Sequence, residues 1–250
     1  MQFGICHLSI VPLRSLPEDS SEMTSQLLYG DHFKVLEQRK NWSRIRMAYD
    51  NYEGWIGNNQ FLSISEPDYG QIDNDRNPRY TSDLISFVST ENNSLIPLVL
   101  GSNVTSIDFF GHKFEGDCID CKQEKIHLLD TALLYLNAPY LWGGKTPFGI
   151  DCSGLVQMVY KINGYGILRD ATQQATQGDA LSFIEESQPG DLAFFDNKEG
   201  IINHVGIIMK DNYIIHSHGK VRIDRLDHTG IFNTDIKSYS HKLRVIKKII

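Results

Sequence analysis

The residues best suited to chemistry gather around one cysteine, Cys152, which lies between Asp151 and Ser153 in the run DCSGLVQMVYKING. Apolar residues recur at helical spacing after it and Gly164 follows as a stop, so the run predicts a helix that begins at the cysteine. Asp151 is then the expected N-cap. Because unpaired backbone N–H groups and the helix dipole favour an anion in the first turn, we expect the pKa of the thiol to be lowered.

Two apolar segments further along the chain carry histidines and are expected to form neighbouring strands. His204 begins HVGIIM, and His216 ends YIIH after a short turn. Side chains alternate between the faces of a strand, so a turn centred on Asp211 would put both imidazoles on one face. Gly206 would then leave open space between the two rings. His218 has the same parity as His216, so the pattern does not choose between them.

A cysteine, a histidine and a third polar group that orients the imidazole make up the machinery of a thiol hydrolase. In this interpretation His204 takes the proton of Cys152, and His216 holds the ring of His204 through a hydrogen bond. The alternative is an inert buried cysteine with unrelated histidines, since free cysteine is commonly buried. The residues alone leave both interpretations open.

The remaining cysteines indicate little chemistry. The chain has four cysteines, too few for a disulfide scaffold. Cys118 and Cys121 form one C-x-x-C, which lacks the second pair of ligands that a structural zinc site requires. Two ordinary thiols are the favoured interpretation, and metal or redox work by this pair is the alternative. We expect no metal and no cofactor.

Composition and charge narrow the class of protein. The chain has 250 residues, 41% of them hydrophobic, and a formal net charge of −7, as in a soluble globular protein. An acidic balance argues against nucleic-acid or membrane partners, and no apolar run approaches the roughly 18 residues of a membrane span. The N-terminus has neither a basic region nor a cleavage site, which favours the cytoplasm.

The hydrophobic pattern divides the chain into three parts. Residues 1–66 contain short, evenly spaced apolar segments that predict a small β-barrel. Residues 67–121 begin with a linker rich in Pro, Gly, Asn and Asp and continue with further short strands, which could form a second barrel. Residues 122–250 change to a helical period and then to strands, the order of an α+β domain.

The first part resembles a bacterial SH3 domain. The matching segments are VPLR (11–14), LYGD (28–31), NWSRI (41–45) and GWI (54–56). They cover nearly the whole of residues 1–66. The resemblance implies an SH3-like barrel, and the strands of residues 67–121 are interpreted as a second, degenerate one.

The third part resembles an NlpC/P60 cysteine peptidase domain. Its matching runs, all in the family's order, are PYLWGG (139–144), GIDCSGLV (149–156), LRDATQQATQG (168–178), QPGDLAFF (188–195), HVGII (204–208) and IIHSHG (214–219). The resemblance implies an α+β, circularly permuted papain-like fold, with Cys152 as nucleophile, His204 as base and His216 as third member. Tyr140 corresponds to a family tyrosine that helps the Cys152 backbone N–H to bind the oxyanion.

The barrel and the residues RDA after the catalytic helix resemble the γ-D-glutamyl-L-diamino acid endopeptidase subgroup. There, acidic and hydroxyl groups hold the free amine of an N-terminal L-Ala; the corresponding residues are Asp151, Ser153 and Asp170, with Glu53 of the barrel as a further candidate. Ala171 departs from the serine usual at its position, which removes one polar contact.

The resemblance implies an enzyme that recycles short cell-wall peptides, since intact wall has its L-Ala acylated. We expect the protein to be a monomer. The runner-up interpretations are another amidase or acyltransferase of the same fold, and a cell-wall-peptide-binding protein without activity.

Overall fold

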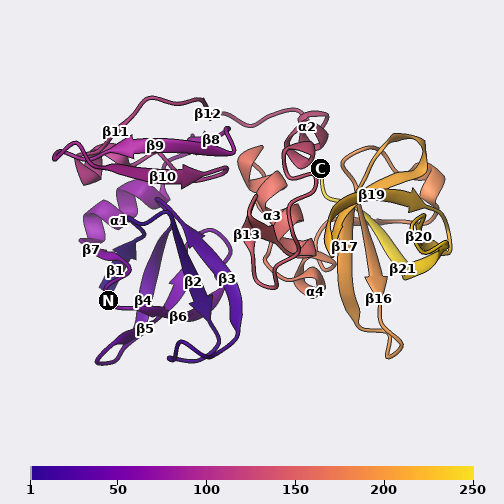
Figure 1. Ribbon diagram of the computed structural model, residues 1–250, viewed down its shortest axis with the longest axis horizontal. Coiled ribbons are helices and arrows are strands. Elements are labelled where there is room, and N and C mark those ends of the chain that lie inside the picture. Colours follow the sequence, from indigo (N-terminus) through magenta and orange to yellow (C-terminus); the bar gives the residue numbers. More distant parts are fainter. Residues whose placement is uncertain (1) are drawn as a thin grey trace. The chain divides into compact units, whose positions relative to one another are not determined.

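The computed structural model describes residues 2–250, which divide into two compact units (Figure 1). One unit holds the residues up to Lys122 together with Trp142–Thr146, and the other holds Gln123–Leu141 and Pro147–Ile250. Among residues 2–250, no helix has both the length and the apolar character needed to cross a bilayer.

The N-terminal unit begins with a seven-stranded antiparallel sheet in the order β3-β2-β6-β5-β4-β1-β7. Burial alternates along β5, where Ser43, Ile45 and Met47 point inward, because successive side chains of a strand face opposite ways. Ile45 and Met47 join apolar side chains of β2, β3, β4 and β6 in one core. The strands are β1 (Gln2–Ile5), β2 (Ile10–Arg14), β3 (Met23–Leu28), β4 (His32–Gln38), β5 (Trp42–Met47), β6 (Glu53–Gly57) and β7 (Leu62–Ile64).

The stretch after β7, interpreted as a linker from its composition, contains the helix α1 (Glu66–Asp73). Ser65 caps this helix by accepting a hydrogen bond from the Asp68 backbone N–H at 3.2 Å. Tyr69 is buried against Phe3 of β1, with ring centroids 4.5 Å apart. The turn-forming residues therefore begin a helix here, and burial of one aromatic ring holds that helix on the barrel.

The strands that follow pack against the first barrel within the same unit. They form a three-stranded sheet, β10-β9-β11, and a two-stranded one, β12-β8. Tyr29 of the first barrel lies in the same core as Val88 and Leu98, so both sets of strands share buried surface. A second SH3-like barrel at residues 67–121 stays a prediction. The elements are β8 (Tyr80–Thr81), β9 (Ile85–Ser89), β10 (Leu95–Val99), η1 (Ile107–Phe110), β11 (Lys113–Phe114), β12 (Cys118–Ile119) and, later in the chain, β13 (Lys145–Thr146).

In the C-terminal unit most helical residues precede the long strands, in the order that the sequence predicts. The helix α3 (Cys152–Ile162) is buried along its whole length and packs against β17 and β18. The other elements are α2 (His127–Leu134), β14 (Gly149–Ile150), α4 (Ala171–Gln174), β15 (Asp179–Leu181), η2 (Ile184–Glu186), β16 (Leu192–Asp196), β17 (Ile202–Ile208), η3 (Lys210–Asn212), β18 (Tyr213–His218), β19 (Lys220–Leu226), β20 (Gly230–Asn233) and β21 (Ser238–Lys248).

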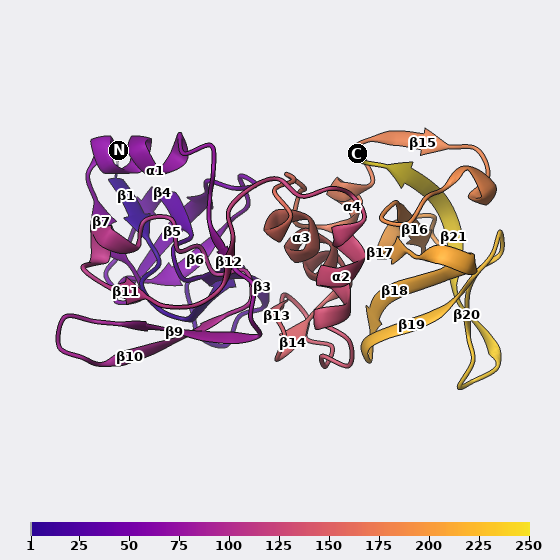
Figure 2. The same cartoon turned by 90° about the horizontal axis from the view of Figure 1, so that it is seen from above.

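The strands β16 to β21 close into a barrel (Figure 2). Each pairs with the next in the chain, and β21 pairs with both β20 and β16. Apolar side chains from all six strands fill the interior: Ala193, Phe195, Ile208, Ile214, Leu226, Ile231 and Ile246. A closed barrel with a packed interior has no free edge and is rigid. Polar side chains on its strands are therefore held in fixed positions.

Candidate active site

Cys152 is the first residue of α3, as the sequence predicts. The Asp151 carboxylate caps the helix by accepting a hydrogen bond from the Gly154 backbone N–H at 2.6 Å. At the other end, Gly164 follows the helix with a φ of 82°, in the left-handed region that glycine adopts easily. The capping residues thus set the length of the helix and put the thiol in its first turn.

The register of β17 and β18 puts the predicted histidines on one face. Gly206 lies opposite His216, and the turn centres on Asp211, whose φ of 58° lets the chain reverse. The expectation of open space at Gly206 is wrong, however. A Cβ atom there would lie 2.7 Å from a methyl carbon of Ile214 and 2.9 Å from Cβ of His216. The glycine permits close packing of the two strands.

His204 and His216 are joined by a hydrogen bond. Nε2 of His204 lies 2.8 Å from Nδ1 of His216, both rings are buried, and their planes are nearly perpendicular. The exposed ring of His218 is centred 6.4 Å from that of His204. The structure therefore selects His216 over His218 as the partner of His204, a choice that the pattern of the sequence left open.

A buried carboxylate stands behind His216, and sequence reasoning missed it. Oδ2 of Asp224 lies 3.1 Å from Nε2 of His216, and the Arg222 guanidinium donates to both oxygens at 2.6 and 2.9 Å. Burial opposes ionisation, but the hydrogen bonds from His216 and Arg222 outweigh it and lower the pKa of Asp224 to about 2. The only hint in the sequence is the polar alternation of Arg222 and Asp224 within VRIDRL.

The expected lowering of the thiol pKa is wrong. Burial, followed by the charge of Asp151, raises the pKa of Cys152 to about 12; the backbone N–H groups of Val205 and Ser153, and Arg169, act in the other direction. The helix terminus acts here too, but burial is the larger effect. The hydrogen bond from Val205 also places the sulfur beside the residue that follows the base on β17.

His204 is a neutral imidazole at neutral pH. Burial, then the neighbouring histidines, lower its pKa well below the usual range. A neutral thiol beside a neutral imidazole requires proton transfer when the sulfur attacks, in place of a resting thiolate.

The Asp151 carboxylate is paired by a buried arginine that sequence analysis did not single out. Arg169 donates to its two oxygens at 3.0 and 2.6 Å and to the hydroxyl of Ser153 at 2.9 Å. Arg169 is 1% exposed. The three side chains form one polar cluster beside the thiol, and a two-pronged pairing of this kind is strong and directional.

The other predicted substrate residues lie in different settings. Asp170 is partly exposed and caps α4 in a reciprocal pair with Gln173. Ala171 begins α4. The pKa of Tyr140 is raised to about 12 by burial and then by Cys152 and Asp151, so its hydroxyl keeps its proton and can donate a hydrogen bond.

Glu53 lies on β6 of the N-terminal unit. Its carboxylate accepts hydrogen bonds from Arg44 and Arg46 at 2.7 to 2.9 Å. These two arginines offset its negative charge, and a contact of Glu53 with substrate stays a prediction.

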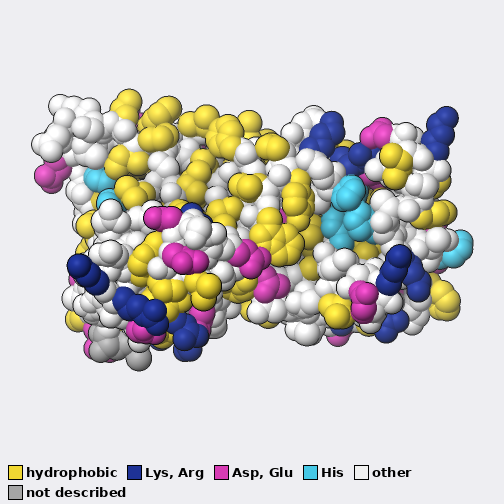
Figure 3. Space-filling model, turned by 60° about the horizontal axis from the view of Figure 1, so that its bottom comes forward, with side chains coloured by type: hydrophobic (Ala, Val, Ile, Leu, Met, Phe, Trp, Pro, Cys, Tyr) yellow, Lys and Arg dark blue, Asp and Glu magenta, His cyan; other side chains and the backbone are white. Residues whose placement is uncertain are grey.

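Histidine side chains also reach the surface together on the C-terminal unit (Figure 3). His241 of β21 stacks on His204, with ring centroids 4.0 Å apart and planes 19° apart. One ring nitrogen from each of His204, His216 and His241 lies within 4.8 Å of the others, close enough to suggest a metal centre. Near-parallel rings direct their lone pairs side by side and not to a common point, and His204 and His216 already bind each other. The cluster suits hydrogen bonding better than metal ligation.

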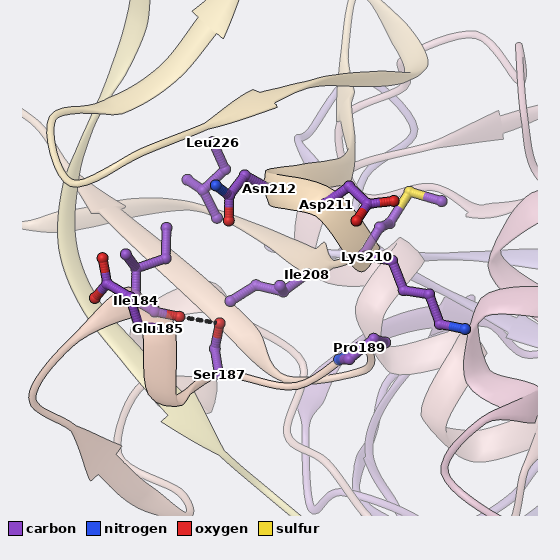
Figure 4. A pocket seen from close by; sticks show the side chains of 10 residues that line it. Ile184, Glu185, Ser187, Pro189, Ile208, Lys210, Asp211, Asn212 and Leu226 are labelled. Atoms are coloured by element: carbon purple, nitrogen blue, oxygen red, sulfur yellow. Dashed lines mark hydrogen bonds between the residues drawn. The ribbon is translucent and has the colours of Figure 1, made fainter.

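A separate pocket of about 290 Å³ is not lined by Cys152 or by any of the three clustered histidines (Figure 4). It is lined by Ile208 at the far end of β17 from His204, by Leu226 and by the turn at Asp211. Ser187 at its rim donates to the carbonyl of Ile184 at 2.6 Å. The pocket offers no nucleophile paired with a base.

Comparison with known proteins agrees with this geometry. The NlpC/P60 family profile matches residues 137–238, and the profile described as "Bacterial dipeptidyl-peptidase Sh3 domain" matches residues 13–61. The "Gamma-D-glutamyl-L-lysine dipeptidyl-peptidase" of Bacillus subtilis is 30% identical over 77% of this chain and 71% of its own. The "Dipeptidyl-peptidase 6" of Lysinibacillus sphaericus is 27% identical over 84% of this chain and 87% of its own. The crystal structure of an NlpC/P60 family protein from Bacillus cereus has a similar fold, with a TM-score of 0.80 at 19% identity over 99% of both chains.

Proposed function

The chain belongs to the NlpC/P60 family of cysteine peptidases, and we propose that it hydrolyses the bond from γ-D-glutamate to a diamino acid in peptidoglycan stem peptides. The preferred substrate is a short fragment, L-Ala-γ-D-Glu-diamino acid, with a free N-terminal amine. The observation that carries the proposal is the 2.8 Å hydrogen bond between His204 and His216, because His204 lies next to Val205, whose backbone N–H binds the Cys152 sulfur.

Each step of the proposed reaction has a group to perform it. His204 removes the thiol proton as the Cys152 sulfur attacks the γ-carbonyl carbon. The Cys152 backbone N–H and the Tyr140 hydroxyl donate to the oxyanion. The intermediate collapses to a thioester as His204 returns the proton to the departing amine of the diamino acid. Water, deprotonated by His204, then hydrolyses the thioester, releases L-Ala-D-Glu and restores the thiol.

The proposed preference for a free amine rests on the charges near the thiol. Asp170 and the hydroxyl of Ser153 are the groups proposed to hold the amine, beside the Asp151 carboxylate that Arg169 pairs. An ammonium facing Asp170 makes a charge-assisted bond that an acylated amine cannot make, a difference of about 1–3 kcal/mol. This difference corresponds to roughly 5- to 150-fold in kcat/KM.

That preference would direct the enzyme to released fragments in place of intact wall, whose L-Ala is acylated. The proposed role is therefore cell-wall recycling by a cytoplasmic monomer, with peptide as partner and neither nucleic acid nor membrane. We further propose that the order of the C-terminal unit, nucleophile helix first and histidine strands second, is a circular permutation of the papain fold.

A panel of four peptides tests the substrate. L-Ala-γ-D-Glu-L-Lys and the diaminopimelate equivalent, each with free and with N-acetylated L-Ala, are incubated with the wild type and with Asp170→Asn. We expect release of the diamino acid from the free peptides and at least fivefold lower kcat/KM for the acetylated ones. Asp170→Asn should reduce the difference in kcat/KM between the free and the acetylated peptides. Equal turnover of free and acetylated peptides would disprove the amine preference, and cleavage at another bond would assign a different acyl chemistry to the same site.

A further inference from the structure

The carboxylate behind the two histidines controls where their protons lie. Nε2 of His216 faces Oδ2 of Asp224 at 3.1 Å, and both side chains are buried. An ionised carboxylate only accepts hydrogen bonds, so Nε2 of His216 must carry a proton and donate. Both side chains are shielded from solvent, since Asp224 is 1% and His216 0% exposed.

The same constraint passes through His216 to His204. A neutral imidazole has one donor and one acceptor nitrogen, so a His216 ring protonated on Nε2 can only accept at Nδ1. The partner of that Nδ1 is Nε2 of His204, at 2.8 Å. His204 must therefore be protonated on Nε2, which leaves its Nδ1 with a free lone pair.

We propose that Asp224 is a positioning residue that sets the tautomers of both histidines and so presents Nδ1 of His204 as the basic nitrogen. This inference rests on the proposed roles of Cys152 and His204 and does not depend on which peptide is the substrate. It adds a fourth member to the predicted triad, at the end of the relay farthest from the thiol.

Arg222 keeps the Asp224 carboxylate ionised and fixed in orientation. The guanidinium holds both carboxylate oxygens, at 2.6 and 2.9 Å, and its Nη2 also reaches Asn233 at 3.2 Å and Asp235 at 2.9 Å. A fork of this kind prevents rotation of the carboxylate and stabilises its charge. Arg222 therefore keeps Asp224 an acceptor, on which the tautomer of His216 depends.

A purely structural ion pair between Arg222 and Asp224 is the competing explanation, and two substitutions separate it from ours. Oδ2 of Asp224 accepts from both Nε of Arg222 and Nε2 of His216, so in Asp224→Asn the amide oxygen takes that place and still accepts from His216. Asp224→Asn thus keeps the acceptor on which the tautomers depend. Asp224→Ala removes the acceptor, so nothing fixes the proton of His216 on Nε2.

We expect kcat to fall by about 10²-fold or more in Asp224→Ala, towards the scale seen when a catalytic triad loses the group that fixes the tautomer of its histidine. Asp224→Asn, which keeps the acceptor, should retain at least tenfold more activity. Asp235→Asn is the control for loss of a charge beside Arg222 and should leave kcat unchanged. A structural role predicts that Asp224→Ala lowers the stability of the protein but not the kcat of the folded fraction, and that result would overturn the proposal.

A second measurement does not require turnover. Imidazole 15N chemical shifts of Cys152→Ala, recorded at pH 8 and assigned with His204→Gln and His216→Gln, report the tautomers directly. We expect both rings protonated on Nε2, and a mixture of tautomers once Asp224→Ala is added. A His204 ring protonated on Nδ1 beside an intact Asp224 would overturn the inference. If the protein cleaved none of the peptides, these shifts would still decide the role of Asp224, so the two proposals fail separately.

Discussion

Gly206 of β17 lies directly opposite His216 of β18, and no other residue could bring the two strands so close at this point. A Cβ atom at Gly206 would lie 2.9 Å from Cβ of His216. The position of the His216 ring, and through it that of His204, thus depends on the absence of one methyl group.

Gly206→Ala should therefore impair both activity and stability. The added methyl must displace Ile214 or His216, so we expect the free energy of unfolding to fall by about 1–3 kcal/mol and kcat to fall at least tenfold. Denaturant unfolding and steady-state kinetics measure the two effects. Gly166→Ala is the matched control, because a Cβ at Gly166 has nothing within 4 Å. Wild-type kinetics in Gly206→Ala would show that the spacing of the two strands does not matter.

The reactivity of Cys152 should rise only at alkaline pH. Its pKa is raised to about 12 by burial, so little thiolate exists at neutral pH without substrate. In a protein with Cys118 and Cys121 replaced by serine, we expect iodoacetamide to label Cys152 slowly at pH 6 and increasingly above pH 8.5. Peptide mapping identifies the labelled residue, and Cys152→Ala supplies the blank. Fast labelling at pH 6 would instead indicate a resting thiolate–imidazolium pair.

The stability of the protein should decrease as the pH falls below 6.5. Burial lowers the pKa of both His204 and His216 in the folded state. Above pH 6.5 the two imidazoles are neutral in both the folded and the unfolded protein, so the full stability is present. Below pH 6.5 the two histidines bind protons in the unfolded chain but not in the folded protein. The free energy of unfolding should then decrease by about 1.4 kcal/mol per pH unit for each ring.

Urea unfolding between pH 5 and 8 measures that slope. His204→Gln should reduce it by the contribution of one ring, whereas His228→Gln, at an exposed position, should leave it unchanged. An identical slope in His204→Gln would mean that this ring titrates normally in the folded protein.

The ion pair between Arg169 and Asp151 should matter far more to stability than the one at the barrel surface. Both side chains of the first pair are at most 8% exposed, so Arg169→Ala leaves a buried carboxylate unpaired and should lower the free energy of unfolding by about 3–5 kcal/mol. Arg44→Ala, which removes an exposed partner of Glu53, should change it by less than about 1 kcal/mol. Similar values for the two variants would contradict the burial argument.

Local signals accounted for the parts of the site that lie close together in the sequence. The N-cap at Asp151 and the helix start at Cys152 follow from residues within a few positions of one another. The turn centred on Asp211 was a condition that the sequence left open and the structure meets. The helix α1 also has local signals, Ser65 and Pro67, but its Asn- and Asp-rich continuation favoured a linker.

The groups that sequence reasoning missed depend on contacts between distant elements. Asp224 becomes a partner of His216 only through the register of β18 and β19, and Arg169 reaches Asp151 across 18 positions. His241 meets His204 because β21 closes the barrel. The raised pKa of Cys152 has the same origin, since helix position can be read from the sequence but burial by β17 and β18 cannot.

The central claim is that the Cys152 thiol, activated by His204, cleaves the γ-D-glutamyl bond. The most direct measurement is mass spectrometry of the products formed from L-Ala-γ-D-Glu-L-Lys by the wild type, Cys152→Ala and His204→Gln, with Cys121→Ala as the control for an unrelated thiol. The account predicts L-Ala-D-Glu and free lysine from the wild type and from Cys121→Ala, with a loss of roughly 10³-fold or more in the other two variants. Unchanged product formation by Cys152→Ala, or no cleavage at this bond by the wild type, would contradict it.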